Sequence, residues 1–204
     1  RWLTPWQAHH HGPVYAALAD RIEAEHPSAD VSALRALVAA NAYLPEIISQ
    51  YEDAEKLIGI PDNEFDMVVS NAVFEHILDH RKASDRCFAV TKPGGFNVHQ
   101  VDFRDHRDFT RPLEFLLMTA DEIAAFMAET DTHEGNQRRA SDYQAAYRDM
   151  GFDVLSAWVT EQASEAYLAD FLPRLRAMPT SPYHGASLDD LRIGGITYVL
   201  RKPL

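Results

Sequence analysis

Side chains able to move a proton gather in one short stretch of the sequence. His99 stands at the end of an apolar run, and Asp102, Asp105 and His106 follow it. Imidazole titrates near neutral pH, so histidine is the first choice for a base that accepts a proton from a hydroxyl group. We expect His99, Asp102 and His106 to act as catalytic groups. Imidazole and carboxylate also suit a divalent metal ion, and this spacing does not exclude one; our prediction includes no metal.

Two further polar segments follow apolar runs. Asp53-Ala54-Glu55 comes after the short run 47–51, and the residues from Asn71 to His76 come after the run 65–70. Asp53 either accepts a hydrogen bond from a ligand amine or caps a turn. Glu75 suits the first turn of a helix, so its role is structural or functional. His76 either covers a ligand or packs at the end of the sheet.

The surrounding pattern predicts alternating strands and helices. The segment Phe65–Ser70 is apolar almost throughout, as in a strand covered on both faces. A helix is expected over Phe74–Val90, a turn at Lys92–Gly95 and a strand over Phe96–Val101. This order is typical of a parallel crossover.

The same criteria predict the remaining elements and an α/β domain spanning residues 1–204. Gly151 is the expected left-handed end of the helix before the fourth strand. The other predicted elements are helices over 13–26, 30–43, 120–129 and 141–150, strands over 47–51, 152–159 and 195–201, and a helical insertion over 161–191.

Composition narrows the function further. The formal net charge of −12 argues against a general nucleic-acid binder, which needs clustered Lys and Arg. The single cysteine, Cys87, excludes a disulfide framework within the chain. No apolar run is long enough for a membrane span, and no signal peptide opens the sequence. We expect a cytoplasmic protein.

Three segments together resemble a known family. The stretches Tyr51–Leu57, Pro61–Ile77 and Lys92–Phe96 are similar in order and spacing to the DAE-L turn, the FD-VVSN-EH strand and the KPGG turn of class I S-adenosylmethionine-dependent methyltransferases of the type 11 group. The resemblance implies a Rossmann-like sheet, mostly parallel with an antiparallel last strand. It also implies S-adenosylmethionine as cofactor and S-adenosylhomocysteine as product.

The resemblance also implies positions for the cofactor. The carboxylate of Asp53 would accept a hydrogen bond from the adenine amino group, with the main chain of Ala54 facing the ring and Glu55 beside it. The sulfonium end and the substrate would lie against the next strand end. The residues expected there are Asn71, Ala72, Val73 and His76.

The sequence departs from the family pattern at its front. Residues 1–50 contain no G-x-G motif, and Gly12 is the one glycine among them. We therefore expect a family member missing the first β-α-β unit. This leaves open a non-catalytic methyltransferase-like binding or interaction module, or a fragment unable to bind the cofactor alone. A hydride-transferring Rossmann enzyme is a distant third interpretation, because it would need G-x-G-x-x-G.

The expected partner is a small molecule, with a small polar or sugar-like hydroxyl acceptor favoured. The insertion 161–191 and the loop after Asp102 would form a lid over it. No nucleic acid and no membrane span is expected. Trp2 and Trp6 would normally lie against the missing elements, so the surface left exposed there invites a homodimer.

Overall fold

A computed structural model describes residues 59–130 and 135–204, together with 16–17, 19–24, 27, 31–32, 35–36, 39 and 57. The chain forms two compact units, Arg1–Tyr51 and Glu52–Leu204. The strand predicted over 47–51 lies outside the described residues. The prediction of one domain over residues 1–204 stays a prediction.

The described part of the first unit is helical. Residues 16–17 and 19–24 are helical, as are 32, 35, 36 and 39, where the sequence predicts two helices. Ala19 and Val31 are buried. Arg35 donates a hydrogen bond of 2.8 Å to Asp20 and another to Glu23. These ion pairs join the two helical stretches.

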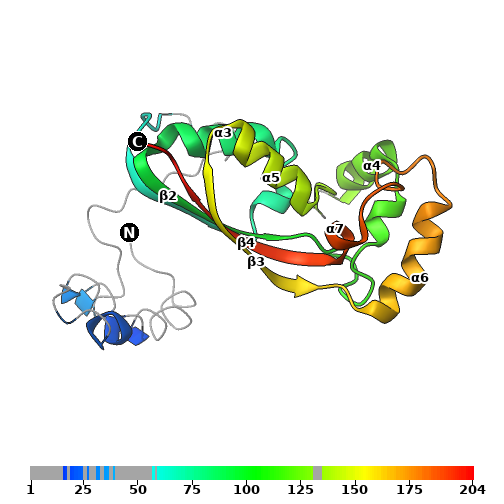
Figure 1. Cartoon of the computed structure of the whole chain (residues 1–204), viewed down its shortest axis with the longest axis horizontal. Coiled ribbons are helices and arrows are strands. Elements are labelled where there is room, and N and C mark those ends of the chain that lie inside the picture. The colour runs from blue at the N-terminus through cyan, green and yellow to red at the C-terminus, as the bar shows by residue number, and fades with distance from the viewer. Residues whose placement is uncertain are drawn as a thin grey trace. The chain divides into compact units, whose positions relative to one another are not determined.

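The second unit is built on a four-stranded sheet in the order β1-β2-β4-β3 (Figure 1). β1 pairs with β2 in parallel, and β4 pairs antiparallel with both β2 and β3. Three strands therefore run in one direction and the last strand runs against them, which confirms the predicted α/β fold class. The strands are β1 (Phe65–Asn71), β2 (Thr91–Asp102), β3 (Asp153–Gln162) and β4 (Ile193–Arg201).

The Lys92–Gly95 segment is part of β2 and not a separate turn before it. Phe65 pairs with Thr91 and Met67 pairs with Phe96, so the extra residues of β2 form an irregularity in the ladder. A Cβ atom on Gly95 would lie 2.9 Å from the carbonyl oxygen of Asp66. Glycine therefore allows the two backbones to approach here.

Helices α3 (His80–Val90) and α5 (Ala140–Asp149) lie on one side of the sheet (Figure 1). The helix predicted from Phe74 begins later, because Asp79 caps it by accepting a 3.0 Å hydrogen bond from the Lys82 amide. Before it, residues 74–76 form the single 3₁₀ turn η1. Gly151 follows α5 with a φ of 91°, which confirms the left-handed helix end.

The main core lies between these helices and the sheet, and it includes an unexpected histidine. Side chains of β2 alternate, so that His99 faces the helices and is fully buried. Its ring lies 4.6 Å from that of Phe74 and 6.0 Å from that of Tyr147, and its Nδ1 shares a 2.8 Å hydrogen bond with Ser70. Burial lowers the pKa of His99 to about 4. The side chain predicted to meet a ligand lies in the core instead.

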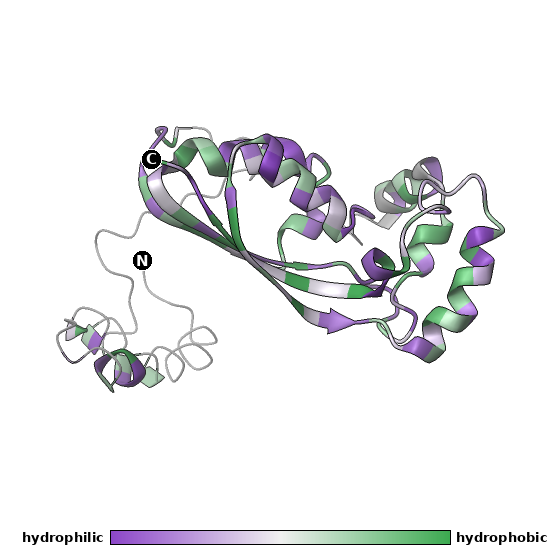
Figure 2. Cartoon of the chain, in the orientation of Figure 1, coloured by the Kyte–Doolittle hydropathy of each residue, from purple (hydrophilic) through white to green (hydrophobic). Residues whose placement is uncertain are grey.

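A second group of helices has its own apolar cluster. It contains η2 (Glu114–Leu117), α4 (Ala120–Thr130), α6 (Glu165–Arg176) and α7 (Leu188–Arg192), and Figure 2 shows both hydrophobic and hydrophilic residues along α6. Arg174 donates two hydrogen bonds to Glu114, 2.6 and 2.8 Å long, which tie α6 to η2. The helical insertion predicted over 161–191 thus packs against the segment that follows β2. Among the described residues no helix has the length and apolar character to cross a bilayer.

Arg139 is a fully buried cation at the start of α5. Its guanidinium donates to the main-chain oxygen of Phe103 at 2.8 Å, of Asp190 at 3.0 Å, and also of Ile193. Burial lowers the pKa of Arg139, an effect that the negative charge of Asp190 opposes. The side chain therefore joins the end of β2 to the end of α7 and the start of β4.

We expect Arg139→Met to destabilise the protein by about 3 kcal/mol, because several buried carbonyl oxygens lose their donor at once. Arg138→Met, at the exposed neighbouring position, is the matched control and should change stability by less than about 0.5 kcal/mol. Urea unfolding followed by circular dichroism measures both. Equal effects of the two substitutions would contradict this role of Arg139.

The buried neutral form of His99 predicts a specific loss of stability in acid. The pKa of His99 lies near 4 in the folded protein, and the ordinary pKa of histidine is 6.5. Neutral His99 makes its full contribution to the free energy of unfolding above the unfolded pKa. This contribution falls by about 3 kcal/mol in all as the pH drops from about 6.5 to 4. Urea unfolding at about pH 7 and about pH 4.5 should show a smaller acid loss in His99→Gln than in the unsubstituted protein. The exposed His184→Gln control should keep the full acid loss; a full loss in His99→Gln would refute the assignment.

Candidate functional site

β1 and β2 end at the same edge of the sheet, where the chain turns sharply. Asn71, Ala72 and Val73 are exposed there. Ala72 has a φ of 51°, and its amide donates to the main-chain oxygen of Gln100 at 3.2 Å and to Oε1 of the same residue at 3.1 Å. Left-handed backbone is uncommon for a residue with a side chain and often occurs at functional sites.

Asn136 stabilises the η1 turn that follows through hydrogen bonds. Its side-chain amide donates to the main-chain oxygens of Phe74 at 3.0 Å and Ile77 at 2.7 Å, and its main-chain amide donates to Glu75 at 2.7 Å. The hydroxyl of Tyr143 donates to Phe74 at 2.9 Å. These contacts fix the positions from which Glu75 and its neighbour project.

Glu75 is a buried carboxylate at this edge, with only 2% of its surface exposed. Neither side-chain oxygen has a hydrogen-bond partner. Burial raises the pKa of Glu75 to about 7, and the nearby negative charge of Asp102 adds to this effect. A carboxyl group in this setting can take up or release a proton near neutral pH, or it can bind a cation.

The loop after β2 supplies the other side of the site. Asp102 accepts two hydrogen bonds from Arg104, at 2.9 and 2.7 Å, and the buried Asp105 is paired in the same way with Arg107. Nε2 of His106 lies 3.8 Å from Oδ2 of Asp102. Arg104 and Arg107 thus stabilise the loop through these ion pairs.

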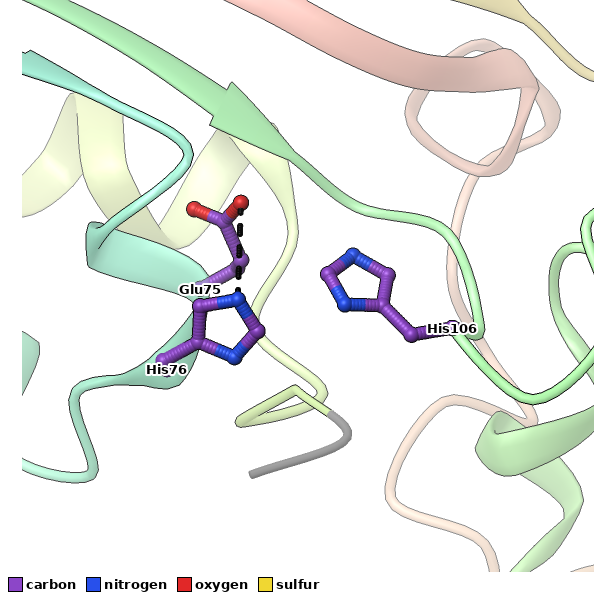
Figure 3. Close-up of side chains that lie close together, drawn as sticks. All are labelled: Glu75, His76 and His106. Atoms are coloured by element: carbon purple, nitrogen blue, oxygen red, sulfur yellow. Dashed lines mark ion pairs between the residues drawn. The ribbon is translucent and has the colours of Figure 1, made fainter. Parts of the chain in front are cut away.

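Figure 3 shows the group that these two segments bring together: Glu75 and His76 from η1, facing His106 from the loop after β2. Nε2 of His76 lies 4.0 Å from Oε1 of Glu75, and the two imidazole rings are 5.0 Å apart. One nitrogen or oxygen atom from each of the three residues lies within 4.8 Å of the others.

The predicted site residues separate into three groups. Asp53, Ala54 and Glu55 lie outside the described residues. His99 lies in the core. The residues found at the shared edge are Asn71, Ala72, Val73, His76, Asp102 and His106.

The grouping of Glu75 with the two histidines was not predicted from the sequence. The adjacent Glu75 and His76 were a visible signal, but nothing in the sequence places His106 opposite them. The metal-binding set considered there, drawn from His99 to His106, is not brought together: His99 is buried elsewhere, and Asp102 and Asp105 are paired with arginines.

Two hollows in the described surface lie at the opposite end of the strands. Gly94 and Phe96 line both of them. Ligands of open α/β sheets bind at the carboxyl ends of the strands, where β1 and β2 meet the η1 turn and the loop after Asp102. We therefore assign no role to these hollows.

Comparison with known proteins finds a family match for part of the chain. Residues 12–98 match the family described as "Methyltransferase domain". That match includes β1, the Ala72 turn and η1. Among curated proteins, DIS3-like exonuclease 2 of Caenorhabditis elegans is 27% identical over 145 residues, which are 62% of this chain and 17% of that protein.

Two of the similar solved structures are methyltransferases by name. A putative sarcosine dimethylglycine methyltransferase from Galdieria sulphuraria is 16% identical with a TM-score of 0.47, covering 92% of this chain and 66% of that one. An S-adenosylmethionine-dependent methyltransferase from Mesorhizobium loti is 16% identical with a TM-score of 0.46, covering 80% and 75%. Likeness at this level establishes no shared activity. The match over residues 12–98 confirms the family resemblance seen in the sequence.

Proposed function

We propose that this protein transfers a methyl group from S-adenosylmethionine to the hydroxyl group of a small polar or sugar-like acceptor. The observation that carries the proposal is the exposed Asn71–Val73 turn beside His76 and His106, at the carboxyl edge of a parallel strand pair. That turn falls inside the segment matched by the methyltransferase family. Residues from two separate segments are thus available to hold a cofactor on one side and an acceptor on the other.

The proposed cofactor contacts follow the edge of the sheet. Asp53 would accept a hydrogen bond from the adenine amino group, with Ala54 and Glu55 beside the ring. Asn71, Ala72, Val73 and His76 would hold the sulfonium end. The sulfonium carries a positive charge, which the nearby carboxylate of Glu75 favours because neither of its oxygens has a hydrogen-bond partner.

The proposed acceptor contacts come from the loop after β2. In the metal-free protein His106 accepts the proton of the acceptor hydroxyl, and Asp102, 3.8 Å away, stabilises the imidazolium that forms. The acceptor oxygen attacks the methyl carbon as the carbon–sulfur bond breaks, which releases S-adenosylhomocysteine. His99 supports the edge through Ser70 and Phe74 and does not touch the acceptor.

The helical layer provides the proposed lid. α6 and α7 pack with η2 in one apolar cluster, and η2 follows directly on the loop that carries His106. Methyl transfer needs an oriented and dry site more than elaborate chemistry, which a covering layer supplies.

One sequence feature favours a second candidate, a methyltransferase-like module that binds no cofactor. Residues 1–50 have Gly12 as their one glycine and no G-x-G motif to approach the methionine end of the cofactor. Cofactor binding by the chain separates the two candidates.

We expect calorimetric titration with S-adenosylhomocysteine to show one site per chain. Asn71→Ala should weaken binding by about tenfold, since one hydrogen bond of about 1.4 kcal/mol is lost. Ser156→Ala is the matched control, because it removes a polar group from the exposed strand β3 and should leave affinity unchanged. Absence of binding would overturn the proposed activity in favour of the module, and unchanged affinity in Asn71→Ala would remove this turn from the cofactor site.

A further inference from the structure

Three potential metal ligands meet where η1 faces the loop after β2 (Figure 3). Glu75 offers a carboxylate oxygen, and His76 and His106 each offer an imidazole nitrogen, all within 4.8 Å of one another. Two imidazoles and one carboxylate form a ligand set that proteins use for zinc and related divalent ions. We propose that Glu75, His76 and His106 bind one divalent transition-metal ion of the zinc type.

The state of Glu75 is the second, independent reason. Its side chain is 3% exposed, it points into the group, and neither of its oxygens has a hydrogen-bond partner. A buried carboxylate without compensation is costly to keep charged. The carboxylate of Asp102 lies close enough to add to this cost, and its own charge is taken up by Arg104. A divalent cation among the three ligands would compensate Glu75.

The backbone around the three side chains is already fixed. Asn136 holds η1 through the main-chain oxygens of Phe74, Glu75 and Ile77. On the opposite side, the amide of Asp105 donates a 2.7 Å hydrogen bond to Pro112, and its carboxylate is held by Arg107. Outer contacts of this kind orient metal ligands and raise affinity.

The distances require only a small adjustment. Zinc binds nitrogen and oxygen at about 2.0–2.1 Å, so two ligands of one ion lie at most about 4 Å apart. Side-chain rotation by under about 1 Å brings the 4.8 Å group into this range. The side chains of His76 and His106 are 33% and 20% exposed, so both histidines lie partly at the surface.

Binding of the ion is a property of these side chains and is measurable without methyl transfer. With the ion bound, His106 is a ligand and no longer a proton acceptor. In a step that rests on the proposed function, the ion would then lower the pKa of a coordinated acceptor hydroxyl.

The experiment titrates Zn²⁺ into the full chain by calorimetry after removal of metals by a chelator, with bound metal counted by mass spectrometry. The consecutive His9, His10 and His11 bind zinc by themselves, so every sample carries His9→Asn, His10→Asn and His11→Asn. The test variants are Glu75→Gln, His76→Asn and His106→Asn, and the matched control is the exposed His184→Asn. Circular dichroism checks that each variant is folded.

We expect one Zn²⁺ per chain in the background protein and in the His184→Asn control. Each of the three test variants should bind at least about 100-fold more weakly, because a direct ligand is lost and even outer-shell losses cost 10–100-fold. Mg²⁺, which prefers oxygen ligands, should bind far more weakly than Zn²⁺.

Absence of stoichiometric zinc in the background protein would overturn the proposal. So would unchanged affinity in His76→Asn and His106→Asn, two variants that circular dichroism shows to be folded. Mg²⁺ binding as tight as Zn²⁺ binding would also exclude a site with two nitrogen ligands. None of these outcomes depends on S-adenosylhomocysteine binding, so failure of the metal site and failure of the proposed activity are distinguishable.

Discussion

The parallel pairing of β1 with β2 is the constraint on which the rest of the second unit depends. Because Ser70 lies beside His99 and Asn71 beside Gln100, both strands end at one edge. Gln100 then accepts two hydrogen bonds from the amide of Ala72 and holds the chain in its left-handed turn. A shift of the pairing by one residue would turn the side chains of β1 to the opposite faces of the sheet and remove this contact.

The charges at that edge of the sheet favour the binding of a cation. Glu75 and Asp102 are carboxylates of the same neighbourhood, yet Asp102 is neutralised by Arg104 and Glu75 is not. Arg139 shows a different solution in the same unit, since its buried guanidinium donates to the main-chain oxygens of Phe103, Asp190 and Ile193. The uncompensated carboxylate of Glu75 therefore lies where we expect a cationic ligand, either a sulfonium or a metal ion.

Much of the fold follows from the sequence, because local patterns decide it. The strand over 65–70 and the positive φ at Gly151 follow from residue type. The expectation that this strand is covered on both faces was wrong, because Phe65, Met67 and Val69 are 40%, 56% and 64% exposed. The start of α3 was predicted too early, at Phe74, because the apolar pattern begins there. The helix begins only after Asp79, which caps it.

The site was harder to predict, because it depends on which face each strand residue takes. Before His99, apolar and polar residues alternate in the order Phe96, Asn97 and Val98. This pattern suggests that Phe96 and Val98 face the core. The structure has the reverse, with Asn97 and His99 buried under the helices and Phe96 37% exposed. Tertiary packing by α3 and α5 decides this. The meeting of Glu75 with His106 likewise depends on two loops far apart in sequence, and no local signal records it.

The most direct test of the central claim is photochemical labelling with S-adenosylmethionine carrying a radioactive methyl group, followed by peptide mapping. The account predicts label on the peptide that contains Asn71–His76, and loss of that label when excess S-adenosylhomocysteine competes. Label on the peptide around Gly94 and Phe96, at the other end of the strands, would contradict the assignment of the cofactor to the edge where β1 and β2 end.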